Sequence, residues 1–236
     1  MRFLRKLHKW LGLIVGLQFV LWSISGLMFA WLDHHDVSGG HGAHKPEAAE
    51  LSRTTVLAEP TTWLADGQPN EVLEIRLTPV LDRWVWRVES TAGVVLRDAV
   101  SGEIVELDES AIRDLAQRYY AGSGALTSVA LHPSATIETR GAGATWETRF
   151  DDDRGTTLYF SADDGRLVQT RNDTWRVFDF FWMLHTMDYR GRDNFNNPLV
   201  ITIGFAALWL ALSGFLLLFK SFRRQDFGLP DASRRA

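Results

Sequence analysis

The feature that most constrains this chain is an uncharged apolar stretch near its N-terminus. Residues 10–32 contain no Asp, Glu, Lys or Arg, and Gln18 carries their only side-chain amide. At about 1.5 Å per residue, a helix of this length crosses a hydrocarbon core of roughly 30 Å. We therefore expect a first transmembrane helix within residues 1–32. A cleaved signal peptide is disfavoured, because the apolar part is too long and no A-x-A-like site follows it.

A second apolar run, residues 199–219, starts after Pro198 and stops at Lys220, which predicts a second transmembrane helix over 198–222. Four basic residues precede the first helix and five follow the second, whereas the segment between them holds 16 basic and 27 acidic residues. Basic residues concentrate on the cytoplasmic side of a membrane. We therefore expect both ends, including the tip of 1–32 and the tail of 223–236, in the cytoplasm, and the central region in the periplasm or cell exterior.

One face of the first helix is lined mainly with small residues. At about 100° per residue, an arc of roughly 80° contains His8, Gly12, Gly16, Phe19, Ser23, Gly26, Ala30 and His34, while His35 falls outside it. Small residues let another helix or a flat ligand approach the backbone, so this small-residue stripe predicts a packing seam or a cofactor site. The two histidines, about 39 Å apart along the axis, suit a relay with one site near each membrane face. The alternative is that both are ordinary interfacial side chains.

The next segment, residues 33–50, is rich in Gly, Ala and His, which is typical of a flexible linker. Together with Asp33 and Asp36, its histidines are also of a kind that binds Zn, Cu or Fe. They are His34, His35, His41 and His44. Metal capture by His41 and His44 for a partner transporter is thus the alternative to a solvated linker. The chain has no cysteine, which excludes disulfides and thiolate ligands.

The central region contains two copies of one unit. Trp84, Arg87, Gly93 and Leu96 recur 62 residues later as Trp146, Arg149, Gly155 and Leu158, and Gly102 and Val105 recur at Gly165 and Val168. Alternating apolar residues predict strands, with hairpin turns at VSGE and DDGR. The segment 108–122 predicts a helix ahead of the second copy, with Gly122 after its end, and 51–65 predicts a weaker one ahead of the first. We expect two repeats, 51–107 and 108–174, each a helix followed by a three-stranded antiparallel meander.

Residues 175–197 are dense in Trp, Phe and Tyr, a composition that suits a membrane interface. As a helix, this aromatic interfacial segment places five residues on one face: Trp175, Phe178, Phe181, Trp182 and His185. We therefore expect His185 at the outer membrane surface, at the level of His34.

Several function classes lack their sequence motifs. The chain has no HExxH, no GxSxG, no phosphate-cradling loop, and no flavin or nicotinamide fingerprint. His132 stands alone before Pro133, which indicates a structural or exposed side chain. Nucleic-acid binding is disfavoured, because the central region is acidic and the basic ends are explained by topology and anionic lipids.

Taken together, these motifs resemble the PepSY-associated transmembrane proteins. The resemblance covers nearly the whole chain and rests on an LHxW start (Leu7, His8, Trp10), the SGLMFAW end of the first helix, an LHT segment (Leu184–Thr186) and a final LSG (Leu212–Gly214). It implies a bacterial inner-membrane α+β protein, in which two transmembrane helices flank a periplasmic domain of two PepSY-like repeats.

The resemblance also implies a function. Proteins of this family are often linked to iron or siderophore use, and some are haem-containing reductases of periplasmic ferric siderophores, with histidines at helix ends carrying the haems. His8 and His185 match such positions directly, and His34 or His35 is the natural extra ligand at the outer end. Larger members have about four spans or more, so a complete four-helix unit would need a homodimer or another membrane partner.

The hypothesis that follows is an electron-transfer protein that holds haem b. On the outer side one chain supplies both axial nitrogens, from His185 and from His34 or His35, with Asp188 as a hydrogen-bond acceptor nearby. On the inner side it supplies only His8, so an inner haem predicts a dimer. The alternatives are a non-enzymatic PepSY binding or regulatory module, and a periplasmic metal-binding accessory protein.

Overall fold

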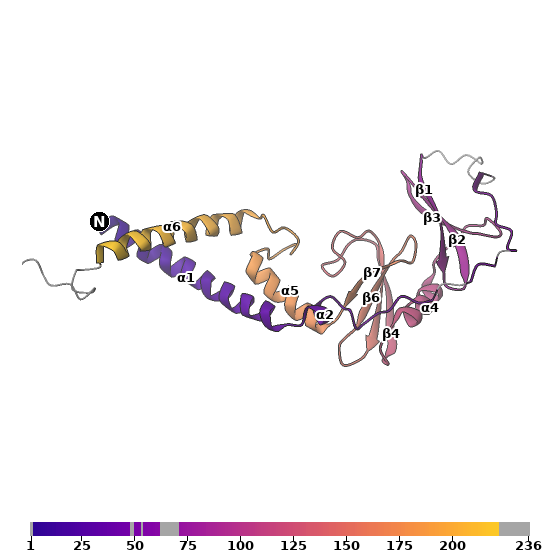
Figure 1. Cartoon of the computed structure of the whole chain (residues 1–236), viewed down its shortest axis with the longest axis horizontal. Coiled ribbons are helices and arrows are strands. Elements are labelled where there is room, and N and C mark those ends of the chain that lie inside the picture. The colour runs from indigo at the N-terminus through magenta and orange to yellow at the C-terminus, as the bar shows by residue number, and fades with distance from the viewer. Residues whose placement is uncertain (1, 48–49, 53, 62–70, 222–236) are drawn as a thin grey trace, which may run out of the picture. The chain divides into compact units, whose positions relative to one another are not determined.

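The computed structural model describes residues 2–47, 50–52, 54–61 and 71–221. The chain divides into two compact units, which we call the helical unit (Met1–Trp31 with Asp179–Ala236) and the sheet unit (Leu32–Phe178). The predicted cytoplasmic tail of 223–236 lies outside the described residues, as does most of the second half of the weaker helix predicted before the first repeat. Figure 1 shows the elements of both units.

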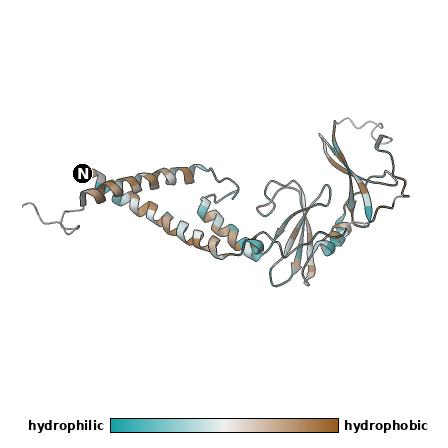
Figure 2. Ribbon diagram, in the orientation of Figure 1, coloured by the Kyte–Doolittle hydropathy of each residue, from teal (hydrophilic) through white to brown (hydrophobic). Residues whose placement is uncertain are grey.

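Two long apolar helices dominate the helical unit, as predicted. α1 (Arg2–Trp31) and α6 (Pro198–Ser221) are each long and apolar enough to cross a membrane, and Figure 2 shows the hydrophobic residues along both. Many of their large apolar side chains are exposed, including Leu17 at 67% and Phe205 at 70%. Such extensive apolar exposure suits contact with lipid or with another apolar surface.

α1 packs within its unit through a face that is rotated from the small-residue stripe. Its buried side chains are Val15, Gln18 and Ser25. Among the described residues, a Cβ added at Gly16 or Gly26 would meet no atom within 4 Å. At about 100° per residue, the two faces are roughly 90° apart. The stripe meets α6 only at its start, through His8 and Gly12, and is open within the chain at Gly16 and Gly26.

The small-residue stripe also ends before His34, because α1 stops at Trp31. Asp33 has an extended backbone, and its Oδ1 accepts the backbone N–H of His35 at 2.8 Å. This contact caps the N-terminus of a separate short helix, α2 (His34–Val37). The prediction that His34 continues the face of the first helix is thus wrong.

The sheet unit contains two antiparallel meanders, with every strand beside its neighbour in sequence (Figure 1). The first meander consists of β1 (Val72–Val80), β2 (Arg83–Ser90) and β3 (Gly93–Asp98). The second consists of β4 (Ala125–His132), β5 (Thr145–Asp151), β6 (Thr157–Ser161) and β7 (Leu167–Arg171).

The two meanders match at the positions that the repeat predicts. Leu96 and its counterpart Leu158 are both fully buried. Gly102 and its counterpart Gly165 have φ of 77° and 67°, a conformation that favours glycine and that both turns require. The second sheet has four strands rather than three, because β4 pairs with β5; β4 was not predicted. In the first copy, the strand that would correspond to β7 is replaced by an isolated β-bridge between Arg97 and Ile104.

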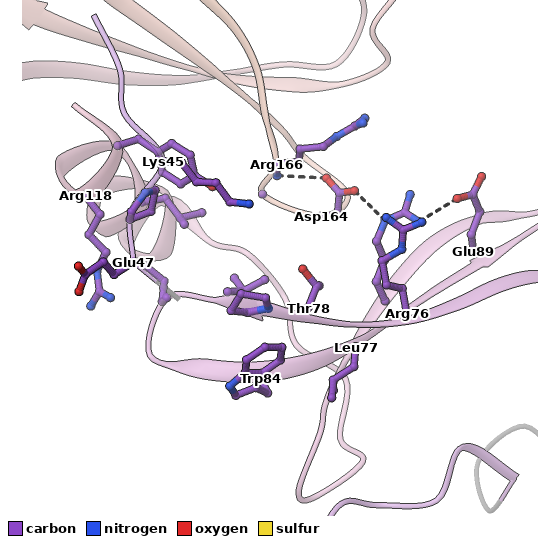
Figure 3. Close-up of a pocket in the computed structure, with 18 of the residues that line it drawn as sticks. Lys45, Glu47, Arg76, Leu77, Thr78, Trp84, Glu89, Arg118, Asp164 and Arg166 are labelled. Carbon is purple, nitrogen blue, oxygen red and sulfur yellow. Dashed lines mark hydrogen bonds and ion pairs between the residues drawn. The ribbon is translucent and has the colours of Figure 1, made fainter. Parts of the chain in front are cut away.

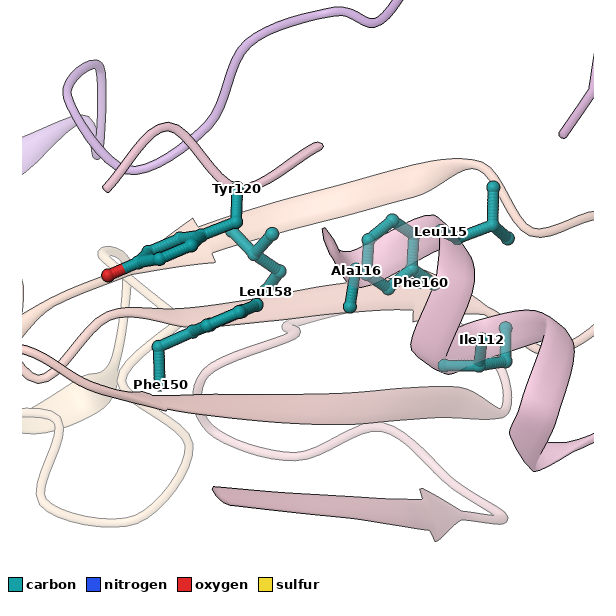
Figure 4. Close-up of a cluster of buried hydrophobic side chains, with 7 residues drawn as sticks. All are labelled: Ile112, Leu115, Ala116, Tyr120, Phe150, Leu158 and Phe160. Carbon is teal, nitrogen blue, oxygen red and sulfur yellow. The ribbon is translucent and has the colours of Figure 1, made fainter. Parts of the chain in front are cut away.

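The core of the sheet unit forms where α4 (Glu109–Tyr119) packs against the second sheet (Figure 4). α4 lies within the predicted 108–122, and Asp108 caps its N-terminus by accepting the N–H of Ala111 at 2.8 Å. The buried cluster comprises Ile112, Leu115, Ala116, Tyr120, Phe150, Leu158 and Phe160. At the end of α4, the ring of Tyr120 stacks on Phe150 with centroids 3.8 Å apart. The buried cluster of the first repeat is smaller and consists of Val80, Val85 and Leu96.

Residues 33–44 lie against this second repeat and are not the flexible linker that was expected. Asn172 Nδ2 donates a hydrogen bond of 2.7 Å to the carbonyl of Asp36, and Ala43 forms a β-bridge with Tyr120. A Cβ added at Gly39 would lie 2.8 Å from Thr170. The glycines that favoured a linker instead permit a close approach to the sheet.

Candidate functional site

Two histidine–serine pairs tie the helical unit together. His185 lies near the C-terminus of α5 (Asp173–Thr186), and its Nδ1 is 2.8 Å from Oγ of Ser25 in α1. His8, at the start of α1, places its Nδ1 2.8 Å from Oγ of Ser213 in α6. In each pair the histidine belongs to one helix and the serine to another. Both histidines that match the LHxW and LHT motifs thus have a fixed partner.

The C-terminal end of α5 is held against α1 by hydrogen bonds to its last carbonyl groups. Gln18 Nε2 donates to the carbonyl of Leu184 at 3.4 Å, and Trp22 Nε1 donates to that of His185 at 2.8 Å. Asn197 Nδ2 donates to the carbonyl of Thr186 at 2.8 Å. The last carbonyls of a helix have no partner inside the helix, so donors are needed where the end is buried. These contacts fix the position of His185.

The surroundings of His185 are aromatic. The ring of Phe29 lies 5.3 Å from the imidazole and that of Trp22 lies 6.3 Å from it, measured between centroids. Ser25 is six residues before the end of α1, or about 9 Å along the axis. The contact with Ser25 thus places His185 alongside the last two turns of α1.

His8 lies at the opposite end of the unit. Seventeen residues separate it from Ser25, which corresponds to about 26 Å along α1. The imidazole lies directly against α6 at Gly214, where an added Cβ would be 3.2 Å from Cε1 of His8. This contact explains two residues of the LSG motif, because Ser213 bonds to the ring and Gly214 leaves room for it.

Asp188 does not act on His185. Its carboxylate accepts backbone N–H groups of the following loop, at 3.1 Å from Asp193 and 3.0 Å from Asn194. Hydrogen bonds from this loop, that of Asn194 foremost, lower the pKa of the Asp188 carboxyl. The hypothesis that Asp188 is the acceptor behind His185 is corrected, since that position belongs to Ser25.

The remaining candidate ligands all lie in the sheet unit. His34, His35, His41 and His44 are exposed. The rings of His35 and His41 are 4.1 Å apart between centroids, and Nε2 of His41 is 3.6 Å from Oδ1 of Asp36. Within the residues that the structure describes, no group of three or more His, Cys, Asp or Glu side chains is placed to hold a metal ion. The structure thus brings His35 and His41 together with one carboxylate but completes no metal-binding group.

His132 belongs to a network of charges that the sequence did not reveal. Its Nε2 lies 3.0 Å from Oε2 of Glu147, and the hydroxyl of Tyr159 lies within hydrogen-bond distance of both Glu147 and Glu138, at 3.1 and 2.9 Å. Burial opposes ionisation of Glu147, but the adjacent Arg149 lowers the pKa of its carboxyl. Burial and the two nearby carboxylates raise the pKa of the Tyr159 hydroxyl. These contacts hold β4, β5 and β6 together, which is a structural role.

A cavity of about 730 Å³ lies in the sheet unit and is lined by both repeats (Figure 3). Its lining combines apolar side chains such as Leu77 with charges of both signs. Arg87 of the first repeat donates to Asp164 of the second at 2.9 Å and to Glu89 at 2.8 Å. Asp164 is also bonded to the backbone N–H of Arg166. This ion pair links the two repeats across the cavity.

The substitution Asp164→Asn is expected to destabilise the sheet unit by about 1.5–3 kcal/mol at pH 7. Burial opposes the charge of Asp164, but the hydrogen bonds from Arg87 and Arg166 outweigh it and lower the pKa of the carboxyl. A lowered pKa contributes stability above the unfolded value of about 3.9, and this stability is lost as the pH falls through the folded pKa. Urea unfolding followed by circular dichroism should therefore show a smaller loss of stability for the variant in acid. Asp163→Asn, at the exposed neighbouring carboxylate, is the control.

Comparison with known proteins gives one match. A family described as the PepSY-associated TM region matches residues 5–236, which is nearly the whole chain. No curated protein and no solved structure matches it. The matched region includes both histidine–serine pairs.

Proposed function

The chain belongs to the PepSY-associated transmembrane family, and from this premise we propose that it is a haem-binding electron-transfer protein of the bacterial inner membrane. The observation that carries the proposal is a pair of imidazoles, each fixed through Nδ1 by a serine of another helix. The two pairs lie about 26 Å apart, measured along α1 from His8 to Ser25. Haem b with two axial imidazoles is the prosthetic group that such a donor set suits. When bound, haem supplies transfer of single electrons.

The residues around His185 fit such a group. Imidazole is a common axial ligand of haem iron, and the apolar rings of Trp22 and Phe29 provide the low-polarity surroundings that tune its potential. The helical unit supplies one histidine at each site, so each site needs a second nitrogen. At the outer site we assign it to His34 or His35, just beyond α1. His41 and His44 are then left with a weaker role in metal binding.

At the inner site, the second nitrogen comes from His8 of another copy of the chain. The small-residue stripe supports this arrangement, because Gly16 and Gly26 are open and His8 lies at the edge of the same stripe. Open glycines on an apolar helix permit close approach of a second helix or a flat ligand. A homodimer would thus bring four apolar helices together and complete an inner site that a single chain leaves half built.

The charge distribution supports the proposed orientation of the chain in the membrane. Basic residues surround both ends of the chain and acidic residues dominate the sheet unit, which favours cytoplasmic termini and a periplasmic sheet unit. Electrons would then leave at the outer site near His185. Within this family, a periplasmic ferric chelate such as a ferric siderophore is the acceptor that we propose.

An absorption spectrum of the detergent-purified, haem-replete chain, with and without dithionite, tests the proposal. The expected result is a Soret band that shifts on reduction, with sharp visible bands typical of two axial nitrogens. A chain that binds haem no better than a matched membrane protein would contradict it. A non-enzymatic binding or regulatory module would then be favoured, and the cavity between the two repeats would be its recognition surface.

A further inference from the structure

The two histidine–serine pairs share one geometry although different helices form them. In both, the serine Oγ faces Nδ1 and not Nε2, at 2.8 Å. Ser25 and Ser213 are both buried, at 0% and 4% exposure. The pairs are crossed, since α1 provides the histidine of one and the serine of the other.

The hydrogens of these serines are directed elsewhere. Oγ of Ser25 donates to the carbonyl of Leu21 at 2.8 Å, one turn earlier in α1. Oγ of Ser213 donates to the carbonyl of Leu210 at 3.0 Å. A hydroxyl has one hydrogen, so once that hydrogen is directed to the backbone the oxygen can only accept. With the serine hydrogen on that carbonyl, the imidazole would supply the hydrogen on Nδ1.

This arrangement favours one tautomer of each ring. A neutral imidazole carries one N–H, so a hydrogen on Nδ1 leaves a lone pair on Nε2. Within the part of the chain that the structure describes, no hydrogen bond reaches Nε2 of His8 or His185. Nε2 is then the nitrogen that can bind iron.

We infer that Ser25 and Ser213 are positioning residues, which hold His185 and His8 as the Nδ1–H tautomer and direct the Nε2 lone pair toward the cofactor. The inference rests on the proposed function for the identity of that cofactor. The hydrogen bond also fixes the orientation of each ring, because Nδ1 cannot leave the serine without losing its partner in an apolar region. A serine, unlike a carboxylate, also adds no charge next to the ligand.

The direct test is the tautomer of each ring in the full chain, reconstituted in lipid bilayers without haem and labelled with ¹⁵N and ¹³C at histidine. Solid-state NMR distinguishes Nδ1–H from Nε2–H, and the variants His8→Gln and His185→Gln assign the signals. We expect the Nδ1–H form at both positions. Ser25→Ala should convert His185 to a mixture of forms and leave His8 unchanged, and Ser213→Ala should do the reverse.

Two matched variants separate positioning from a general structural effect. Ser23→Ala removes an exposed serine of the same helix that also donates to its own backbone but touches no histidine, so it should leave both rings unchanged. Ser25→Thr retains the hydroxyl and should retain the Nδ1–H form of His185. Observation of the Nε2–H form in the unmodified chain, or of no change in the Ser→Ala variants, would overturn the inference.

A second measurement distinguishes this inference from the proposed function. In haem-replete protein, Ser25→Ala should weaken haem binding at the outer site by about 10–100-fold, the usual effect of removing a hydrogen bond behind a metal ligand. Ser25→Thr should restore most of it. If the unmodified chain shows the stated tautomers but binds no haem, the proposed function fails while the serine assignment stands. Haem binding with unchanged affinity in Ser25→Ala would contradict the serine assignment alone.

Discussion

His185→Ala is expected to remove about two thirds of the haem from the purified protein, and His8→Ala about one third, if each iron takes two axial nitrogens. The ratio follows from the proposed assembly. Each chain of a dimer has its own outer site with His185, whereas the two copies of His8 share one inner site. Haem per protein, measured as the pyridine haemochrome, gives both values directly.

The control for this pair of substitutions is His44→Ala, which removes an exposed histidine of the sheet unit and should leave the haem content unchanged. The two losses should also be independent, so the double variant His8→Ala with His185→Ala should bind no haem. Equal losses in the two single variants would contradict the shared inner site. Loss of all haem in either single variant would indicate one site and not two.

Local sequence patterns were sufficient to predict the two apolar helices and most of the strands of the sheet unit. An uncharged run of residues 10–32 has few alternatives to a membrane helix. Alternation of apolar and polar residues along β2 and β5 predicted strands with one buried face. Gly102 and Gly165 predicted turns that need positive φ. These properties depend on neighbours within a few residues, which is why the sequence reveals them.

The pattern of β4 was not recognised for a local reason. Its pairing with β5 shifts register between Leu126 and Ser128, so the alternation of buried and exposed residues is interrupted within the strand. A period of two read from the sequence fails at such an irregularity.

The sequence did indicate the face on which α1 packs, but the small-residue stripe was the more conspicuous pattern. Gln18, Trp22 and Ser25 lie at i, i+4 and i+7, which places three hydrogen-bonding side chains on one side of an apolar helix. Their partners are the last turn of α5, where exposed carbonyl groups need donors in an apolar environment. These donors therefore orient this side of α1 toward the end of α5.

The serine partners could not be predicted, because they lie 160 and 205 residues from their histidines. The sequence marked His8, His185, Ser25 and Ser213 through the resemblance, but no spacing rule joins residues so far apart. The same holds for Asp188, which is close to His185 in sequence and yet bonds to its own loop. Pairing across helices is a property of the tertiary fold.

A substitution in the small-residue stripe is the second change for which we expect a large effect. Gly16→Leu is expected to abolish dimer formation and to remove the inner haem, while the outer haem and the fold of the single chain are retained. Inside the chain the substitution is tolerated, because an added Cβ at Gly16 meets no described atom within 4 Å. Leucine also favours a helix over glycine by up to about 1 kcal/mol. The leucine side chain should therefore disturb only the packing of a second chain against the stripe.

Gly204→Leu provides the matched control, since Gly204 is an equally open glycine in the other apolar helix. Size-exclusion chromatography with light scattering reports the oligomeric state, and haem content reports the inner site. Loss of the dimer in both variants would show that a large side chain in either apolar helix prevents dimer formation. A Gly16→Leu chain that remains dimeric would exclude the stripe as the interface. A monomeric Gly16→Leu chain that keeps about two thirds of its haem, the fraction left if only the shared site is lost, would instead join two observations. The glycines left open in a single chain and the histidine left without a second nitrogen would then both be explained by another copy of the chain.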